Sequence, residues 1–198
     1  MMYYIYMKTC IILGNTREKS ITEATVKLFS DELAARGARI TTFALREKTI
    51  QSCVGCDKCH AVMDSFGCVI KDDMPEIAEE ILSSDLVVFS SPIYTWFATP
   101  PLKALMDRLY AFTKFTDTVD MFNLLKKPHF ALVATSGDVC ANNCDLLDEA
   151  IKRFTKFIKR PYLGYFAAQD EGYENCTRQE VVDGARAFAE KCMASIKA

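Results

Sequence analysis

The stretch KTCIILGNTREKSIT, residues 8–22, predicts a buried strand that runs through one glycine into a helix. Its apolar run, residues 10–13, is unbroken, as is typical of strands covered on both faces of a parallel sheet. Gly14 marks the turn. Ser20 with Glu23 fits a capping box, in which side chains bond the free N–H groups of a first helical turn. The stretch is therefore expected to begin an α/β sheet.

The same order of strand and helix recurs along the chain. Further strands are predicted at residues 38–43, 86–89, 130–134 and 163–167. Capping pairs predict where three of the later helices begin: Asp73 with Glu76, Thr99 with Pro100, and Thr177 with Glu180. Five strands alternating with helices predict a three-layer α/β sandwich around a five-stranded parallel sheet, with ligands beyond the carboxyl ends of the strands.

Length and composition favour one domain over residues 1–198. The chain is 50% apolar or aromatic and 25% charged, which is ordinary for a globular protein. A formal net charge of -2 without a Lys/Arg cluster argues against nucleic acid and membrane surfaces as partners, because both attract clustered cations. The N-terminal residues lack the features of a signal peptide, and nine cysteines then suit a reducing compartment. We therefore expect a cytoplasmic protein.

The loop after the first strand is a candidate phosphate site. It precedes a helix N-terminus, whose free amides and positive dipole end favour an anion. The candidate contacts are Asn15, Arg17, Ser20, Ile21 and Thr22. Neither a Walker motif nor a G-x-G-x-x-G fingerprint is present, which favours one monophosphate over a nucleoside triphosphate or a pyrophosphate. The alternative is a turn in which the hydroxyls only cap the helix.

Two further loops are candidates to contact a flat apolar ring system. Three aromatic residues follow the third strand, in a connection where polar residues are usual. The candidates there are Pro92, Ile93, Tyr94, Trp96 and Phe97, and after the fourth strand they are Thr135, Ser136, Gly137 and Asp138. The alternatives are aromatic rings that cover the core or a subunit interface, and a simple turn after the fourth strand.

Together these loops resemble a known family. Residues 14–22 are similar to its G-S-x-R-x-x-x-x-T loop, with departures at Asn15, Glu18 and Lys19. Residues 91–94, 102–103 and 107–108 are similar to its S-P-x-Y, L-K and D-R signature. The family is that of the NADPH-dependent FMN reductases and iron-sulfur flavoproteins, and the resemblance covers residues 8 to about 112. It implies a flavodoxin-like fold with noncovalent FMN, its phosphate on residues 15–22 and its ring between residues 92–97 and 135–138.

The resemblance also implies a chemistry and an assembly. NADH or NADPH would reduce the flavin, which passes electrons to a small-molecule or protein acceptor, so no catalytic acid or base of the protein is required. A homodimer or higher homo-oligomer is implied, with residues 111–127 as a candidate to cap the partner's flavin. The alternative for this stretch is a lid on its own subunit.

A cysteine-rich insertion is predicted at about residues 48–72, between the second strand and the next helix. Cys53, Cys56 and Cys59 have C-x2-C-x2-C spacing, and Cys68 follows. Three hypotheses stay open for these thiols: ligands of a [4Fe-4S] cluster, as in the iron-sulfur flavoproteins that the chain resembles, ligands of a structural zinc with or without His60, and reduced thiols. The remaining cysteines are expected to be structural: Cys10, Cys140, Cys144, Cys176 and Cys192. Two of them, Cys140 and Cys144, follow the fourth strand and are expected near the flavin edge.

The predicted function is that of an NAD(P)H-dependent oxidoreductase of the flavin or quinone reductase type, acting through FMN. The alternative is an electron carrier that relays electrons between a [4Fe-4S] cluster and FMN. A flavodoxin-like binding protein with structural zinc is a third hypothesis, which leaves the aromatic loop unexplained.

Overall fold

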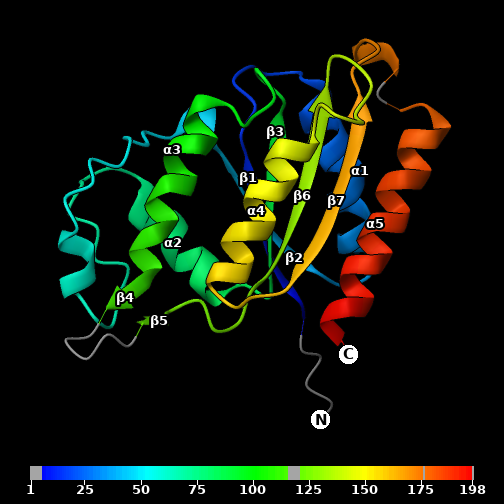
Figure 1. Cartoon of the computed structure of the whole chain (residues 1–198). Coiled ribbons are helices and arrows are strands. Elements are labelled where there is room, and N and C mark those ends of the chain that lie inside the picture. The colour runs from blue at the N-terminus through cyan, green and yellow to red at the C-terminus, as the bar shows by residue number, and fades with distance from the viewer. Residues whose placement is uncertain (1–5, 116–120, 176, 198) are drawn as a thin grey trace.

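The computed structural model describes residues 6–115, 121–175 and 177–197. At its centre lies a five-stranded parallel sheet in the order β2-β1-β3-β6-β7 (Figure 1). The strands are β1 (Lys8–Leu13), β2 (Arg39–Ala44), β3 (Leu86–Pro92), β6 (His129–Ser136) and β7 (Tyr162–Gln169). Every predicted strand is present, and the flavodoxin-like α/β fold is confirmed.

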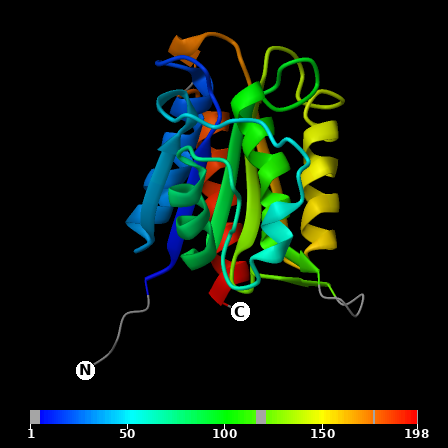
Figure 2. The ribbon, with the colours of Figure 1, turned by 90° about the vertical axis from the view of Figure 1, so that its left-hand side faces the viewer.

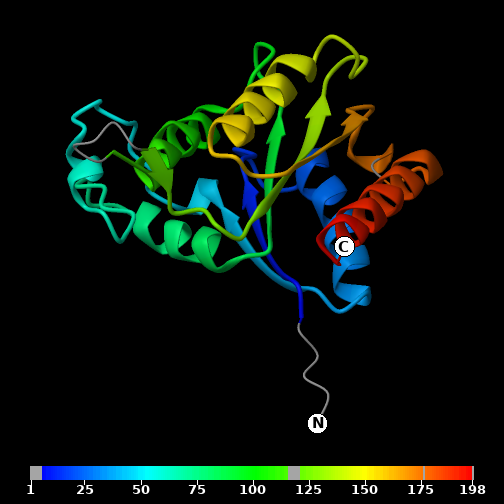
Figure 3. The same ribbon diagram turned by 60° about the horizontal axis from the view of Figure 1, so that its bottom comes forward.

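Helices cover both faces of this sheet (Figure 3). One face carries α1 (Ile21–Ala35) and α5 (Gln179–Lys197), and the other carries α2 (Met74–Ser83), α3 (Pro100–Arg108) and α4 (Asp145–Phe157). Each face has its own apolar core: Phe29 of α1 packs on Phe188 of α5 over the first face, and Phe130 of β6 packs on Phe154 of α4 on the second. Among the described helices none has the length and apolar content needed to cross a bilayer.

Shorter elements occupy the insertion and the connection before β6. They are the 3-10 helices η1 (Leu45–Glu47), η2 (Lys58–Ala61), η3 (Leu109–Phe112) and η4 (Tyr173–Asn175), and a two-stranded antiparallel sheet of β4 (Thr113–Phe115) and β5 (Met121–Asn123). Figure 2 shows the cysteine-rich insertion, in cyan, on the outer side of α2 and α3.

Gly14 lies where the backbones of β1 and β3 come closest. Its amide donates to the Ser90 carbonyl at 2.7 Å, and the Thr99 hydroxyl donates to the Gly14 carbonyl at 2.6 Å. A Cβ at Gly14 would lie 2.7 Å from the Ser90 oxygen, which is backbone and cannot rotate away. A glycine here therefore lets β1 end against β3 and turn sharply toward α1.

The predicted caps have different outcomes. The Ser20 cap is confirmed, since its hydroxyl accepts from the Glu23 amide at 3.1 Å. Asp73 is the residue before α2, as predicted, but its side-chain capping bond is absent: its carboxylate accepts from the Thr49 amide at 2.7 Å, and Asp72 instead accepts from the Met74 amide at 3.1 Å. The two aspartates before α2 thus also accept hydrogen bonds from the backbone at the start of the insertion. Residue spacing within the helix does not predict such long-range bonds.

Candidate functional site

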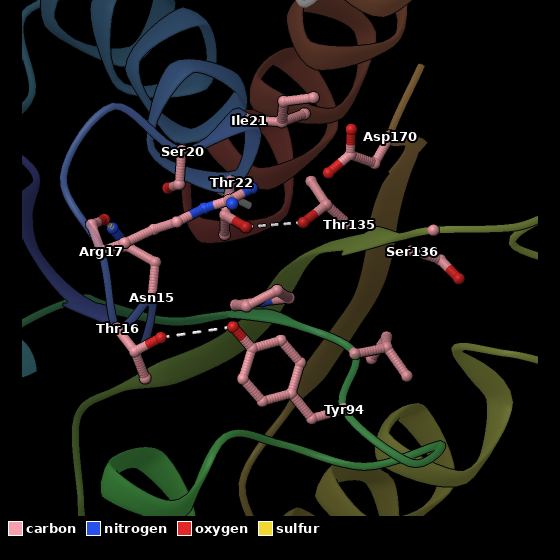
Figure 4. A pocket seen from close by; sticks show the side chains of 13 residues that line it. Asn15, Thr16, Arg17, Ser20, Ile21, Thr22, Tyr94, Thr135, Ser136 and Asp170 are labelled. Atoms are coloured by element: carbon pink, nitrogen blue, oxygen red, sulfur yellow. Dashed lines mark hydrogen bonds between the residues drawn. The ribbon is translucent and has the colours of Figure 1, made fainter. Parts of the chain in front are cut away.

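A cavity of about 190 Å³ opens at the carboxyl ends of β1, β3 and β6 (Figure 4). This is the edge of the sheet at which parallel α/β folds bind ligands. Residues from five separate segments line it: Asn15, Thr16, Arg17, Ser20, Ile21, Thr22, Pro92, Ile93, Tyr94, Thr135, Ser136, Gly137 and Asp170.

The N-terminus of α1 forms one wall of the cavity. Ile21 and Thr22 begin the helix, so their amides have no carbonyl partner within it. The amides add to the positive end of the helix dipole, and the exposed Arg17 adds a full positive charge. This wall can hold a monophosphate group.

Two buried threonine hydroxyls form a hydrogen bond at the base of the cavity. The Thr22 Oγ1 atom on α1 lies 2.6 Å from Thr135 Oγ1 on β6, and each residue is 2% exposed. Figure 4 shows the two side chains facing each other from opposite elements. A hydroxyl that donates can also accept, so this pair retains hydrogen-bonding capacity for a ligand.

Asn15 braces the loop between β1 and α1. It is 1% exposed, and its Nδ2 donates to the Arg17 carbonyl at 2.6 Å and to the Glu23 carboxylate at 3.3 Å. Its Oδ1 has no hydrogen-bond partner among the described residues. Asn15, which stands where the family pattern has serine, therefore shapes the loop. It also leaves one buried acceptor at the cavity that a ligand hydroxyl can bind.

The aromatic loop after β3 forms the opposite wall. The Tyr94 hydroxyl lies 3.2 Å from Thr16 Oγ1, as Figure 4 shows. Tyr94 and Phe97 exchange backbone hydrogen bonds of 2.9 and 3.0 Å, which close a tight turn at Thr95 and Trp96. Both turn residues have positive φ, 49° and 61°. Such backbone is strained for a β-branched and a bulky residue, a kind of strain that clusters at functional sites.

Three predicted contacts lie outside the cavity lining. Trp96 is at the tip of the turn and 54% exposed, Phe97 packs partly on the core, and the Asp138 carboxylate accepts from the Val139 amide in an exposed turn. The other eleven candidates all line the cavity. Thr16 and Asp170 were missed: Thr16 lies inside the quoted loop, and Asp170 directly follows the fifth predicted strand, which is the signal that could have found it.

The four cysteines of the insertion line one further cavity, of about 200 Å³. Cys53 and Cys56 are exposed, and Cys59 and Cys68 are partly buried. The Gly55 amide donates to the Cys53 sulfur at 3.5 Å. No three His, Cys, Asp or Glu side chains in the described parts of the chain gather tightly enough for one metal ion.

A buried ion pair supports this second cavity. Arg108 pairs with Asp72, both side chains are 0% exposed, and Arg108 Nη2 lies 3.4 Å from the Cys68 sulfur. Burial acts to raise the pKa of Asp72, but hydrogen bonds from Arg108 and from the amides of Gln51 and Met74 outweigh it and hold the pKa below its usual range. The pair therefore fixes the chain on either side of the cysteines.

Lys114 adds a second buried cation beside the same segment. Its ammonium donates to the Cys59 carbonyl at 2.9 Å and to the Phe66 carbonyl at 3.3 Å, and the residue is 0% exposed. Burial lowers its pKa. Among the described residues, Asp72 is the one carboxylate that forms an ion pair with either Arg108 or Lys114. Two buried cations therefore lie beside the cysteine cavity, and one of them is paired with Asp72.

The described part of residues 111–127 packs on the insertion. The His60 ring lies edge-on to Phe115 with centroids 4.8 Å apart, and His60 Nδ1 lies 2.7 Å from the Thr113 carbonyl. In Figure 1 the β4–β5 sheet lies at the end of the molecule where the strands of the main sheet begin, opposite the flavin candidates. In this structure the described residues of the stretch therefore do not cover the flavin cavity of their own subunit; residues 116–120 lie outside the described parts of the chain.

Similar sequences and folds are found among flavoproteins. A family model described as NADPH-dependent FMN reductase matches residues 7–145. An iron-sulfur flavoprotein of Methanocaldococcus jannaschii is 35% identical over 105 residues, which are 53% of this chain and 52% of the relative. The match thus spans about half the length of this curated relative, as it does for a second one of the same organism.

Two solved structures share the fold over nearly the whole chain. An NAD(P)H:quinone oxidoreductase from Methanothermobacter marburgensis has a TM-score of 0.70 at 15% identity, covering 93% of this chain and 94% of that one. An FMN-dependent NADH-azoreductase from Bacillus anthracis, in complex with FMN, has a TM-score of 0.64 at 17% identity, covering 96% and 99%. At these identities the likeness is one of fold.

Proposed function

The chain belongs to the NADPH-dependent FMN reductase family, and on that premise we propose that it is an oxidoreductase that takes electrons from NADH or NADPH and passes them through noncovalent FMN. The observation that carries the proposal is the cavity at the strand ends, with a helix N-terminus and the buried Thr22 and Thr135 hydroxyls inside it. FMN, when bound, supplies the redox chemistry, and the protein binds and orients it.

Each wall of the cavity has a separate role in this proposal. Arg17 and the first amides of α1 would hold the phosphate, and the orphaned Asn15 Oδ1 would accept from a ribityl hydroxyl. Ile93 and Tyr94 on one side and Gly137 on the other would flank the ring. These residues position the cofactor, and none needs to transfer a proton.

We propose as a second function that the protein relays electrons between this flavin and a [4Fe-4S] cluster. The four insertion cysteines share one cavity, with the Arg108 guanidinium 3.4 Å from the Cys68 sulfur and the Lys114 ammonium bonded to the Cys59 carbonyl, two cations that would balance part of the charge of a thiolate-bound cluster. Cys53, Cys56, Cys59 and Cys68 would ligate the cluster, which supplies one-electron transfer when bound.

Helix α3 connects the two proposed centres. It begins after Thr99, which bonds Gly14 at the edge of the flavin cavity, and ends at Arg108 in the lining of the cysteine cavity. Nine residues of helix span roughly 14 Å. One rigid element therefore holds both sites in a fixed relation.

The acceptor and the assembly are also proposals. We expect a small molecule or a redox protein as acceptor, a reducing cytoplasm as compartment, and a homodimer or higher homo-oligomer. In such an assembly, residues 111–127 would cap a partner's flavin, a role that is compatible with the place of their described part at the opposite end of the sheet from their own flavin cavity.

The test is an absorption spectrum of protein purified without oxygen, combined with iron, zinc and acid-labile sulfide per chain. We expect oxidised-flavin bands together with iron and sulfide. Cys56→Ser should lose the iron and keep the flavin, whereas the matched variant Cys140→Ser, outside the cysteine cavity, should keep both. No flavin even after FMN is added would refute the first function, and flavin without iron would refute the second.

The electron source separates the two functions further. Steady oxidation of NADPH with a quinone or free flavin as acceptor supports the reductase. Reduction only by a ferredoxin-type donor supports the relay.

A further inference from the structure

Two cysteines outside both sites lie together in the connection from β6 to α4. Cys144 is the residue before α4 and is 0% exposed, while Cys140 is partly exposed. The Cys144 amide donates to the Cys140 carbonyl at 3.1 Å, which closes a tight turn in which Asn142 has a positive φ of 65°. Neither cysteine is among the residues that line the cysteine cavity.

The two thiols interact directly. The Cys144 thiol donates a hydrogen bond to the Cys140 sulfur, and this bond, aided by the Arg178 guanidinium and opposed by burial, lowers the pKa of Cys140 to about 7. The same bond, burial and the carboxylates of Asp145 and Asp148 raise the pKa of Cys144. Cys140 is thus the more acidic and also the more exposed of the two thiols, which fits it to attack, while the buried Cys144 retains its proton.

Other buried cysteines of the chain lack this arrangement. Burial raises the pKa of Cys192 to about 12, and it also raises the pKa of Cys10. Neither thiol has another cysteine among the groups that shift its pKa. Buried, solitary thiols of this kind are unreactive.

We propose that Cys140 and Cys144 form a reversible dithiol–disulfide pair, in which Cys140 attacks and Cys144 resolves. A disulfide joins residues whose Cα atoms are about 4.4–6.8 Å apart. The backbone bond from Cys144 to Cys140 holds these two residues together in one tight turn. The residues inside the turn, Ala141 and Asn142, are exposed, so the adjustment needed to join the sulfurs falls on exposed backbone.

The oxidant in this proposal is a low-molecular-weight disulfide. The Cys140 thiolate attacks one of its sulfurs, forming a mixed disulfide and releasing one thiolate. The Cys144 sulfur, on losing its proton, then attacks the Cys140 sulfur and releases the second small thiol. Two protein thiols lose two electrons and two protons, and one small disulfide becomes two thiols.

The experiment exposes the FMN-loaded full chain to oxidised glutathione and maps its cysteines by tryptic digestion and mass spectrometry. Cys140 and Cys144 lie on one tryptic peptide, residues 127–152, with no other cysteine. We expect this peptide to lose the mass of two hydrogens and to regain it with dithiothreitol. A peptide that keeps two free thiols, or a lasting glutathione adduct on Cys140, would overturn the proposal.

Two substitutions of Cys144 test the assigned roles. Cys144→Ala removes both the resolving thiol and the hydrogen-bond donor, so a stable glutathione adduct should form on Cys140. The midpoint of the pH profile for Cys140 alkylation should rise from about 7 toward the ordinary thiol value. At pH 7 the alkylation rate should fall roughly fivefold to tenfold, because a smaller fraction of Cys140 is thiolate and the greater nucleophilicity of the more basic thiolate offsets only part of that loss. Cys144→Ser keeps a donor and should retain most of the low midpoint; equal profiles for both variants would refute the role of the hydrogen bond.

Discussion

Replacing Arg108 with methionine is expected to destabilise the fold by about 3–5 kcal/mol. The guanidinium and the Asp72 carboxylate form an ion pair in which both side chains are 0% exposed. Methionine fills part of the volume but leaves the carboxylate buried, with only the amides of Gln51 and Met74 as partners. Removing one member of a buried pair is harmful because the other charge stays out of water without compensation.

The double variant Arg108→Met with Asp72→Asn is the matched control. Asparagine keeps a carbonyl oxygen to accept from an amide of the insertion, and it removes the unpaired charge. We expect the double variant to recover about 2 kcal/mol of the loss, as contacting residues show coupling of this size. A double variant as unstable as the single one would mean that the charge is not the cause.

Urea unfolding at several pH values measures this effect, with FMN saturating and iron content determined for each protein. The pKa of Asp72 in the folded wild type lies below its ordinary value of about 3.9. The pair therefore contributes stability that is present above that pH and is lost as the pH falls through the lower, folded value. Without Arg108, burial should raise the pKa of Asp72. Acidification then neutralises the buried carboxylate and restores part of the variant's lost stability, so the unfolding free energies of the variant and the wild type converge. A loss below about 1 kcal/mol, or a difference independent of pH, would refute the reasoning.

Three further predictions concern the flavin cavity. Thr22→Val should weaken FMN binding about tenfold in a fluorescence titration, the effect of losing one hydrogen bond to a charged group. The control is Thr25→Val, which should leave the titration unchanged because the Thr25 hydroxyl has no partner among the described residues. Gly14→Ala should lower the unfolding free energy by about 1–3 kcal/mol through overpacking against the neighbouring strand, and an unchanged urea midpoint would contradict that packing. Thr95→Asn with Trp96→Gly should raise the melting temperature, because both positions have positive φ. Lower turnover with retained FMN would then place the strained turn in substrate handling, whereas a lower melting temperature would refute the strain.

Prediction from sequence succeeded where the signal was local. The strand at residues 86–89 and the cap at Ser20 were correct, because burial on both faces and capping depend on residues close together in the chain. The loops after the first, third and fourth predicted strands do meet at one cavity, because the carboxyl ends of parallel strands share one edge of the sheet. Trp96 failed as a lining residue because the tight turn points it outward, and that direction depends on backbone angles that its residue type does not predict.

The amino-acid sequence by itself determined the alternation of strands and helices, the family and the edge of the sheet that carries the candidate site. Only the tertiary structure decided which distant side chains meet there. Thr22 and Thr135 are 113 residues apart, and Arg108 lies 40 residues from Cys68. Those contacts depend on the order of the strands and on how each helix docks against the sheet. Hydrophobic periodicity specifies that a residue is buried but not against which partner, so such pairs appear only when the chain is folded.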